Sequence, residues 1–545
     1  MALLDEYRVG EDGAWSDREA AHLLRRAGFG GSIPEREAAV GNGSQEAFRA
    51  AIAGLVDYLP DDPNLDAPSG VGVWGGPFAA LPDGDTDEGN TKNPTEIMWL
   101  SSHLFYRLRF TSQPLQEQFG QFLHDHFVSE FWKVYQGVER FQGGCVDVRA
   151  KTAELLLQQN TLLRRIGIDD FRETLIQISR DPAMLFYLDN VVNGAGAGRA
   201  QENYAREIME LFSMGVDNYS ENDVREIAKC FTGETLPNIR DCDGGFGAPD
   251  AFEYGFRDGN HEPGEKVVFG QIVTEDMTGG ELPQVVDLIL SKVSVQPSVQ
   301  GLPAPYNNLP AAAVYMSWKL LRWFVNQNVA LDPPADAVLE LADYMRGTDT
   351  GDFPQRRYPY DLRACMYKLL SSRYFFGEAN YFSIVKTPAD FAAMLVRILD
   401  IDYYRGIYGD GPANRMEWMG MRLFDAPDVS GWRQGRRWIN AEYLAERINF
   451  VERITSWYVS DEWIDDLQVL NGGSLQPADH AGILDYFIDL LVQDDLEVWA
   501  PGSRTLLLGY MAEVADRFDD TDRRFQVQVR GIMYFLMSLP VWQMK

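Results

Sequence analysis

Gln201-Glu-Asn-Tyr-Ala-Arg-Glu-Ile-Met-Glu-Leu-Phe212 is the stretch that best defines the fold of this chain. Its apolar residues recur at spacings of three and four, which is typical of an amphipathic helix. The apolar residues that share one helical face are Tyr204, Ile208, Leu211 and Phe212. The polar residues on the other face are Asn203, Arg206, Glu207 and Glu210. We therefore expect a helix that packs on one side and presents charge on the other.

The same periodicity dominates residues 95–232 and 311–545, so the sequence predicts a mainly α fold. The segment 59–93 is rich in Pro, Asp and Gly, which predicts a long surface loop. The segment 235–310 is predicted to be an irregular insert with a β-hairpin. We expect a large multi-helical single body. Its parts are an N-terminal helix plus acidic loop (1–94), a helical core (95–234), the insert (235–310) and a helical C-terminal part (311–545).

The charge of the chain excludes several classes of partner. Its 545 residues carry a formal net charge of −32, which repels nucleic-acid phosphates and anionic lipid surfaces. We expect no membrane span and find no signal-peptide pattern at Met1–Arg8. The four cysteines show no Cys-x-x-Cys spacing; Cys230 and Cys242 are close enough in sequence to pair across a loop if the protein works in an oxidising compartment.

The charged face of 201–212 allows two interpretations. In one it is an exposed face with ion pairs at a spacing of four, Glu202 with Arg206 and Arg206 with Glu210. In the other it binds a polar substrate, and a partly buried Glu207 acts as general acid because burial raises its pKa. Arg206 or Glu210 would then orient Glu207 or hold it ionised, and Asn203 would donate to a substrate oxygen.

Three histidines are considered as possible metal ligands or bases. His124 and His126 lie about 200° apart on a predicted helix, so they cannot bind one ion together. We expect His126 to point inward, as a hydrogen-bonded core residue or as a ligand or base, and His124 to lie on the wetter face. His261 lies on an insert loop, and His126, Glu207 and His261 could converge as a two-histidine, one-carboxylate site for a divalent metal.

The segment 425–440 combines flexible glycines with two large aromatic rings, Trp432 and Trp438. One role for these rings is to lock the loop onto the helical body. The alternative is a stacking platform that binds sugar rings as substrate.

Five sequence motifs, taken together, resemble a bacterial family known as "domain of unknown function 1800". The motifs are His22–Gly30, Gln201–Phe212, Ser220–Gly233, Asp258–Lys266 and Asp425–Asn440. The chain departs from the family pattern at Asn260, where an Arg is usual, at Glu262, where an Asp is usual, and at Glu234, where a Trp is usual. The resemblance implies a periplasmic or extracellular protein. It also implies a stable partner from the family "domain of unknown function 1501", whose members are often encoded beside these proteins.

Three functional hypotheses follow from these observations. The first is an extracytoplasmic, hydrolase-like enzyme acting on a polar polymer such as a polysaccharide, with Glu207 as general acid and His126 or His261 assisting. The second is a non-catalytic helical binding or assembly partner of a co-encoded protein. The third is a metal-dependent enzyme, which requires the histidines to meet.

Overall fold

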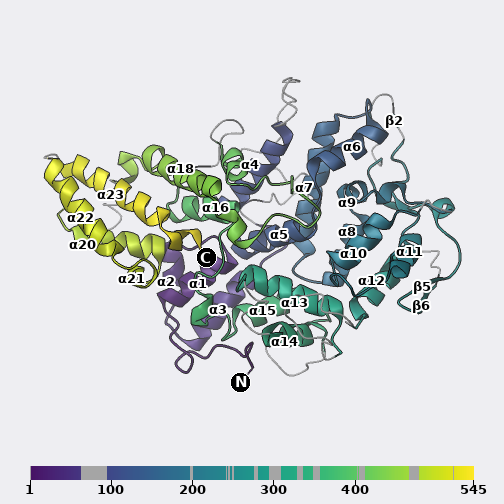
Figure 1. Ribbon diagram of the computed structural model, residues 1–545, viewed down its shortest axis with the longest axis horizontal. Helices are drawn as coiled ribbons and strands as arrows, with labels where there is room; N and C mark the ends of the chain where they lie inside the picture. Colours follow the sequence, from purple (N-terminus) through teal and green to yellow (C-terminus); the bar gives the residue numbers. More distant parts are fainter. Residues whose placement is uncertain are drawn as a thin grey trace.

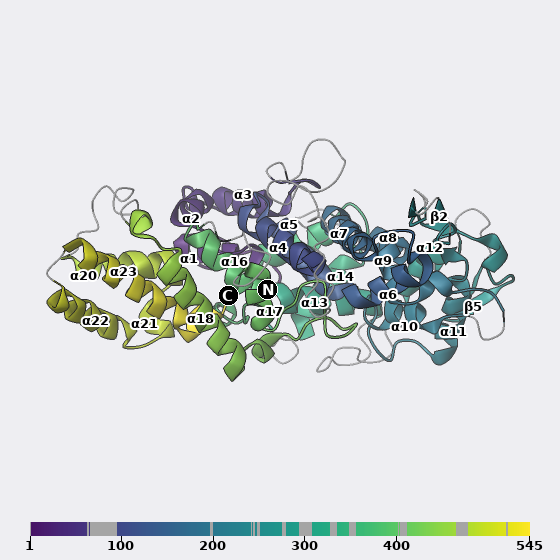
Figure 2. The same ribbon diagram turned by 90° about the horizontal axis from the view of Figure 1, so that it is seen from above.

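Helices dominate the structure, as the periodicity predicts, and they form an elongated body (Figure 1). The computed structural model describes residues 2–62, 65, 95–196, 200–240, 242–243, 246–247, 251–274, 280–293, 308–327, 335–347, 356–401, 403, 411–464, 478–518 and 521–545. Most of the predicted surface loop 59–93 lies outside the described residues. The chain runs from the middle of the body to one end, returns through the middle, and finishes in helices at the opposite end (Figure 2).

The first half of the chain supplies the N-terminal and central helices. Ser16 and Glu19 form a capping box at the start of the first helix. The helices are α1 (Asp17–Ala27), α2 (Ile33–Val40), α3 (Gln45–Val56), α4 (Thr95–Phe110), α5 (Pro114–His126), α6 (Phe131–Gln142), α7 (Val148–Ile166), α8 (Phe171–Arg180), α9 (Pro182–Tyr187), α10 (Glu202–Glu210) and α11 (Glu221–Cys230).

The insert is irregular with short hairpins, as expected, but it also contains a helix that the sequence analysis did not predict. The described strands pair in antiparallel twos: β1 (Glu234–Thr235) with β4 (Gly255–Phe256), β2 (Cys242–Asp243) with β3 (Phe246–Gly247), and β5 (Lys266–Val268) with β6 (Gln271–Val273). The unpredicted helix is α12 (Leu282–Ser291), whose apolar residues Val285, Val286 and Ile289 are fully buried.

The second half of the chain is mainly helical in its described residues, with a longer non-helical segment between α17 and η5. Its longer elements are α13 (Ala311–Phe324), α14 (Ala335–Met345), α15 (Leu362–Leu370), α16 (Pro388–Ile398), α17 (Pro412–Trp418), the 3-10 turn η5 (Gly435–Trp438), α18 (Ala441–Trp457), α20 (His480–Phe487), α21 (Leu496–Trp499), α22 (Ser503–Arg517) and α23 (Thr521–Ser538). The last four form one end of the body, opposite α11 and the β5–β6 hairpin (Figure 1).

Two hydrophobic cores meet at the end of α5. Phe122 and Phe127 belong to one core, whereas Val128 and Phe131 belong to the other. The helix α5 lies in the middle of the body, and every residue from Leu115 to His126 is buried (Figure 2). The His-x-His motif therefore sits where the chain passes from one core to the other.

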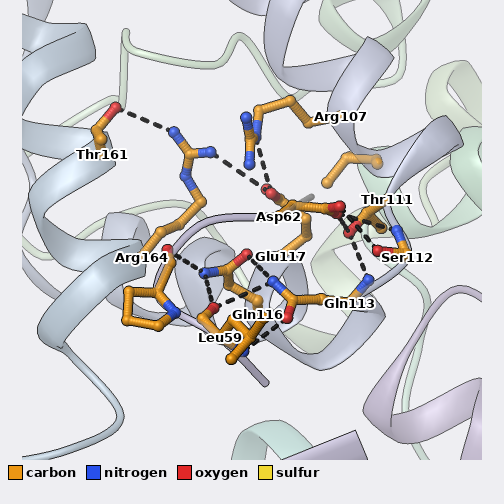
Figure 3. Close-up of polar contacts among 12 residues, drawn as sticks. Leu59, Asp62, Arg107, Thr111, Ser112, Gln113, Gln116, Glu117, Thr161 and Arg164 are labelled. Atoms are coloured by element: carbon orange, nitrogen blue, oxygen red, sulfur yellow. Dashed lines mark hydrogen bonds and ion pairs between the residues drawn. The ribbon is translucent and has the colours of Figure 1, made fainter. Parts of the chain in front are cut away.

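A buried ion cluster fixes α5 to its neighbours α4 and α7. Glu117 is enclosed between Arg107, whose Nε lies 2.8 Å from its carboxylate, and Arg164, at 3.5 Å. Beside it, Asp62 accepts hydrogen bonds from the hydroxyls of Thr111 and Ser112 (Figure 3). Charges this deeply buried are tolerated because opposite charges and hydrogen bonds surround them.

The cysteines do not pair as the sequence spacing suggested. Cys230 is buried and free, so a Cys230–Cys242 disulfide is not formed, and Cys365 is also free. Cys145, in contrast, is disulfide-bonded. Among the helices that the structure describes, none is both long enough and apolar enough to cross a bilayer.

Candidate functional site

The helix α10 has the two faces that its sequence predicts. Tyr204, Ile208 and Met209 are buried, and the Tyr204 ring packs against Phe231 at 5.5 Å. Asn203 is exposed on the opposite face, where its amide nitrogen lies 3.4 Å from the Asp189 carboxylate. The polar face is thus held in place by a packed apolar face.

Two charged residues of α10 are already engaged with neighbours. Arg206 makes a bidentate pair with Glu221 of α11 at 2.8 and 2.9 Å and a looser contact with Glu202 at 3.8 Å. Glu210 accepts a hydrogen bond from the Tyr219 hydroxyl. Of the two ion pairs expected from spacing, the one with Glu202 is present. In the described part of the chain, the other is replaced by these contacts to the next helix.

Glu207 differs from its neighbours. Its carboxyl group is half-buried, and no ion pair or hydrogen bond engages it among the described residues. Burial, with a smaller contribution from Glu210 and against the opposing charge of Arg206, raises the pKa of Glu207 to about 7. A carboxyl group with this pKa can hold and release a proton near neutral pH.

Tyr187, at the end of α9, is affected by the charge of Glu207 and of two further acidic residues. Burial raises the pKa of the Tyr187 hydroxyl, and the negative charges of Glu130, Asp428 and Glu207 raise it further. These three residues come from the start of α6, from the loop after α17 and from α10. Charges from the motifs 201–212 and 425–432, more than two hundred residues apart in the sequence, therefore act on the same hydroxyl.

Glu130 and Asp425 form a hydrogen-bonded carboxyl pair in this cluster. Burial is the largest cause of the raised pKa of each group. Glu130 also accepts hydrogen bonds from the backbone nitrogens of Trp132 and Lys133 as the N-cap of α6. Two adjacent carboxyl groups are costly to ionise together, so Glu130 and Asp425 titrate as a pair. We call four residues the carboxyl cluster: Glu130, Glu207 and Asp428, whose charges act on Tyr187, and Asp425, the partner of Glu130.

His126 points inward, as the sequence predicts. Its Nε2 lies 2.9 Å from the carbonyl oxygen of Phe212, so the proton is on Nε2, because a carbonyl can only accept. Burial lowers the pKa of His126 well below its ordinary value, which keeps the ring neutral.

His124 is not on a wetter face, and that expectation was wrong. Its ring packs against Phe424 and Trp432, at centroid distances of 4.7 and 5.0 Å, and burial lowers its pKa to about 4. Asp125 is equally buried. The physical reason is that neighbouring elements cover α5 on all sides, so the helix has no wet face.

His261 does not approach the charged face of α10. It is buried, its Nδ1 lies 2.7 Å from the carbonyl oxygen of Thr232, and its Nε2 lies 3.1 Å from Lys266 Nζ. Lys266 in turn binds Glu281 at 2.7 Å. A hydrogen bond to Glu281 is the largest cause of the raised pKa of His261.

The predicted metal set of His126, Glu207 and His261 is therefore not formed, because each histidine is bound by a different part of the chain. Within the described residues, no three His, Cys, Asp or Glu side chains are placed to hold one metal ion.

Trp432 and Trp438 serve chiefly to lock their loop, since their exposed fractions are 6 and 2%. Asp125 fixes this loop by accepting hydrogen bonds from the Trp432 backbone nitrogen and from Gln434 Nε2, both at 2.7 Å. Neither indole forms an open platform.

A cavity of about 610 Å³ lies between this loop, the end of α5 and α13. It is lined by Phe122, Asp125, His126, Trp318, Lys319, Arg322, Trp323, Asp428, Ser430, Gly431, Trp432, Arg433, Gln434 and Arg437. We call it the loop pocket. Asp428 belongs both to the pocket and to the carboxyl cluster, and Phe212, bound by His126, follows directly after α10. The pocket and the cluster are thus neighbouring parts of one candidate site.

A family model described as "Protein of unknown function (DUF1800)" matches residues 22–544. The chain belongs to this family. No curated protein and no solved structure matches it.

For this DUF1800 protein, sequence reasoning singled out Glu207 and His126 as candidates but not the residues around them. Tyr187, Glu130 and the basic residues of the loop pocket lie on separate elements, so no local motif joins them. One signal was available: Arg433, Arg436 and Arg437 form a basic run in a strongly acidic chain.

Proposed function

We propose that the protein is an extracytoplasmic acid–base hydrolase that acts on a polar polymer such as a polysaccharide, with Glu207 as general acid. The observation that carries the proposal is the Glu207 carboxyl group, half-buried and unengaged among the described residues, with a pKa of about 7. Such a group is protonated often enough at neutral pH to protonate a leaving oxygen, and proton transfer of this kind contributes about 10²- to 10⁴-fold to rate.

The carboxyl cluster supplies the complementary base. In this proposal one carboxylate of the Glu130–Asp425 pair takes a proton from water. In the proposed step, Glu207 gives its proton to the leaving oxygen as the bond to that oxygen breaks. Water adds to the other fragment and gives its proton to the pair.

His126 assists by holding substrate, and His261 has no part in the proposal. The Nδ1 of His126 is buried, unprotonated and without a partner among the described residues, so it can accept a hydrogen bond from a ligand in the loop pocket. His261 is held by Thr232 and Lys266. Work outside the cytoplasm is supported by the disulfide at Cys145, because disulfides persist in oxidising compartments.

The test is the Glu207→Gln variant, assayed by release of reducing ends from a panel of polysaccharides, with Glu202→Gln as control. Glu202 is an exposed carboxylate on the same helix. We expect the Glu207 variant to lose about 10²-fold or more of kcat, while Glu202→Gln keeps full activity. If Glu207→Gln keeps every activity and only its melting temperature changes, the general-acid role is wrong.

A second candidate, an assembly role beside a protein of the family "domain of unknown function 1501", is favoured by exposed apolar side chains at one end of the body. Leu506 of α22 and Trp457 of α18 are 75 and 69% exposed, and Phe535 of α23 is also exposed. A contiguous exposed apolar patch marks a site of protein contact, and the proposal takes these side chains to form one.

For this candidate we expect that Leu506→Ser with Phe535→Ser abolishes co-purification of the two co-expressed proteins. Val216→Ser, at an exposed position after α10, should not. Equal recovery of the partner with all variants would contradict the assembly role.

A further inference from the structure

The loop pocket carries more positive charge than its own acidic residues can neutralise. Four cationic side chains line it, and the acidic residues that line it are Asp125 and Asp428. The cations are Lys319, Arg322, Arg433 and Arg437. This concentration of positive charge occurs in a chain that has 81 Asp and Glu residues but only 49 Lys and Arg residues.

These four cations have no ion-pair partner among the described residues, in contrast to many other arginines of the chain. Arg107, Arg172 and Arg206, for example, each lie within 2.8 Å of a carboxylate. Asp125 influences Lys319 and Arg322 through charge but directs its own oxygens to Trp432 and Gln434. Asp428 accepts instead from the backbone nitrogen of Ser430 at 2.9 Å.

Arg322 and Arg437 are close enough to repel each other. Burial is the first cause of the lowered pKa of Arg322, and the positive charge of Arg437 is the second. Bringing like charges together at a partly buried position is unfavourable unless an anion joins them. Guanidinium groups bind carboxylate and sulfate oxygens in bidentate geometry, so an oxyanion would relieve the repulsion.

The pocket also presents hydrogen-bond donors that have no acceptor. Arg322 Nε and the indole nitrogens of Trp318, Trp323 and Trp432 are buried without a partner among the described residues. A ligand rich in acceptor oxygens would match these donors. The faces of Trp318 and Trp323, which are partly buried, suit the apolar faces of a sugar ring.

We propose that the loop pocket binds the acidic group of an anionic polysaccharide, the carboxylate of a uronic acid or a sulfate ester. Lys319, Arg322, Arg433 and Arg437 bind the oxyanion, and the tryptophans contact the sugar ring. The inference rests on the proposed function in naming its substrate class, but binding can be measured without turnover. The net charge of −32 disfavours a densely charged polyanion, so a short acidic segment is the expected ligand.

The test compares Arg437→Gln with Arg436→Gln by isothermal titration calorimetry. The two residues are exposed neighbours in η5, but Arg437 lines the pocket and Arg436 does not. The probes are tri-galacturonate, a sulfated disaccharide from heparin, neutral maltotriose and tri-glutamate. We expect one or both acidic sugars to bind wild type, Arg437→Gln to weaken binding about tenfold or more, and Arg436→Gln to leave it unchanged.

Which acidic sugar binds decides between a carboxylate and a sulfate ligand. Four results would overturn the proposal: equal binding of maltotriose, equal loss in both variants, binding of tri-glutamate but not of either acidic sugar, or no binding of any probe. Wild-type melting temperatures in both variants ensure that a loss reports on the pocket rather than on folding.

The same experiment separates this proposal from the proposed function. Binding without cleavage by wild type would reject the hydrolase and keep the anion pocket. Cleavage that Arg437→Gln leaves unaffected would keep the hydrolase and reject the pocket.

Discussion

At the scale of single residues, the candidate site consists of ordinary groups in unusual surroundings. Glu207, Asp125 and the Glu130–Asp425 pair all have raised pKa values, with burial as the largest cause. The residue types could be read from the sequence, and Glu207 was chosen from them. The burial of each group depends on other elements, so sequence reasoning named Glu207 as a candidate acid without Tyr187 and Glu130.

Glu207 should also make folding stability depend on pH. Its pKa is raised from 4.5 to about 7 in the folded protein, so between these values the folded state binds more protons than the unfolded state. Its contribution is therefore fully present below about pH 4.5 and is lost as pH rises through 7. Glu207→Gln removes this dependence.

We expect Glu207→Gln to be more stable than wild type at pH 8 by about 1 kcal/mol, less than a fully buried group would give, because solvent screens the half-exposed side chain. The stability difference between variant and wild type should become less favourable to the variant as pH falls from 8 to 4. Urea denaturation at the two pH values measures this. A difference independent of pH would show that Glu207 titrates near its ordinary value.

At the scale of elements, the segment 425–440 positions the site. It carries Asp425 and Asp428 to the carboxyl cluster, while Asp125 of α5 holds its middle at Trp432. Gly431 is at a φ of 92°, where side chains are strained, and a Cβ there would press against the oxygens of Asp125. The glycine predicted as a turn residue is thus required by a close approach as well.

Gly431→Ala should destabilise the protein by about 2 kcal/mol, because strain at positive φ adds to the clash with Asp125. It should also weaken ligand binding in the loop pocket. The matched control is Gly509→Ala in α22, where a Cβ would meet nothing within 4 Å. Replacement there should stabilise the helix by about 0.5–1 kcal/mol. Chemical denaturation compares the two, and a neutral Gly431→Ala would contradict the close approach.

At the scale of the whole molecule, the packing of helices decides which polar residues are buried. The sequence predicts α5 as an amphipathic helix with His126 inside and His124 outside, yet both are buried because α5 lies between two cores. The ion cluster of Glu117 with Arg107 and Arg164 shows the same effect (Figure 3). The strongly negative chain nevertheless gathers in one pocket four cations that have no ion-pair partner among the described residues, and they come from two distant parts of the sequence.

The sequence by itself determined the family, the mainly α fold, an irregular insert with a hairpin within 235–310, and the two faces of α10. Each of these follows from local spacing, capping or turn residues, which act over a few positions along the chain. Only the tertiary structure placed His261 with Lys266 and Glu281, brought the charge of Glu207 to act on Tyr187, and brought α13 to the 428–437 loop. These contacts join residues far apart in the sequence, and their burial and charge depend on how the helices pack rather than on any one segment.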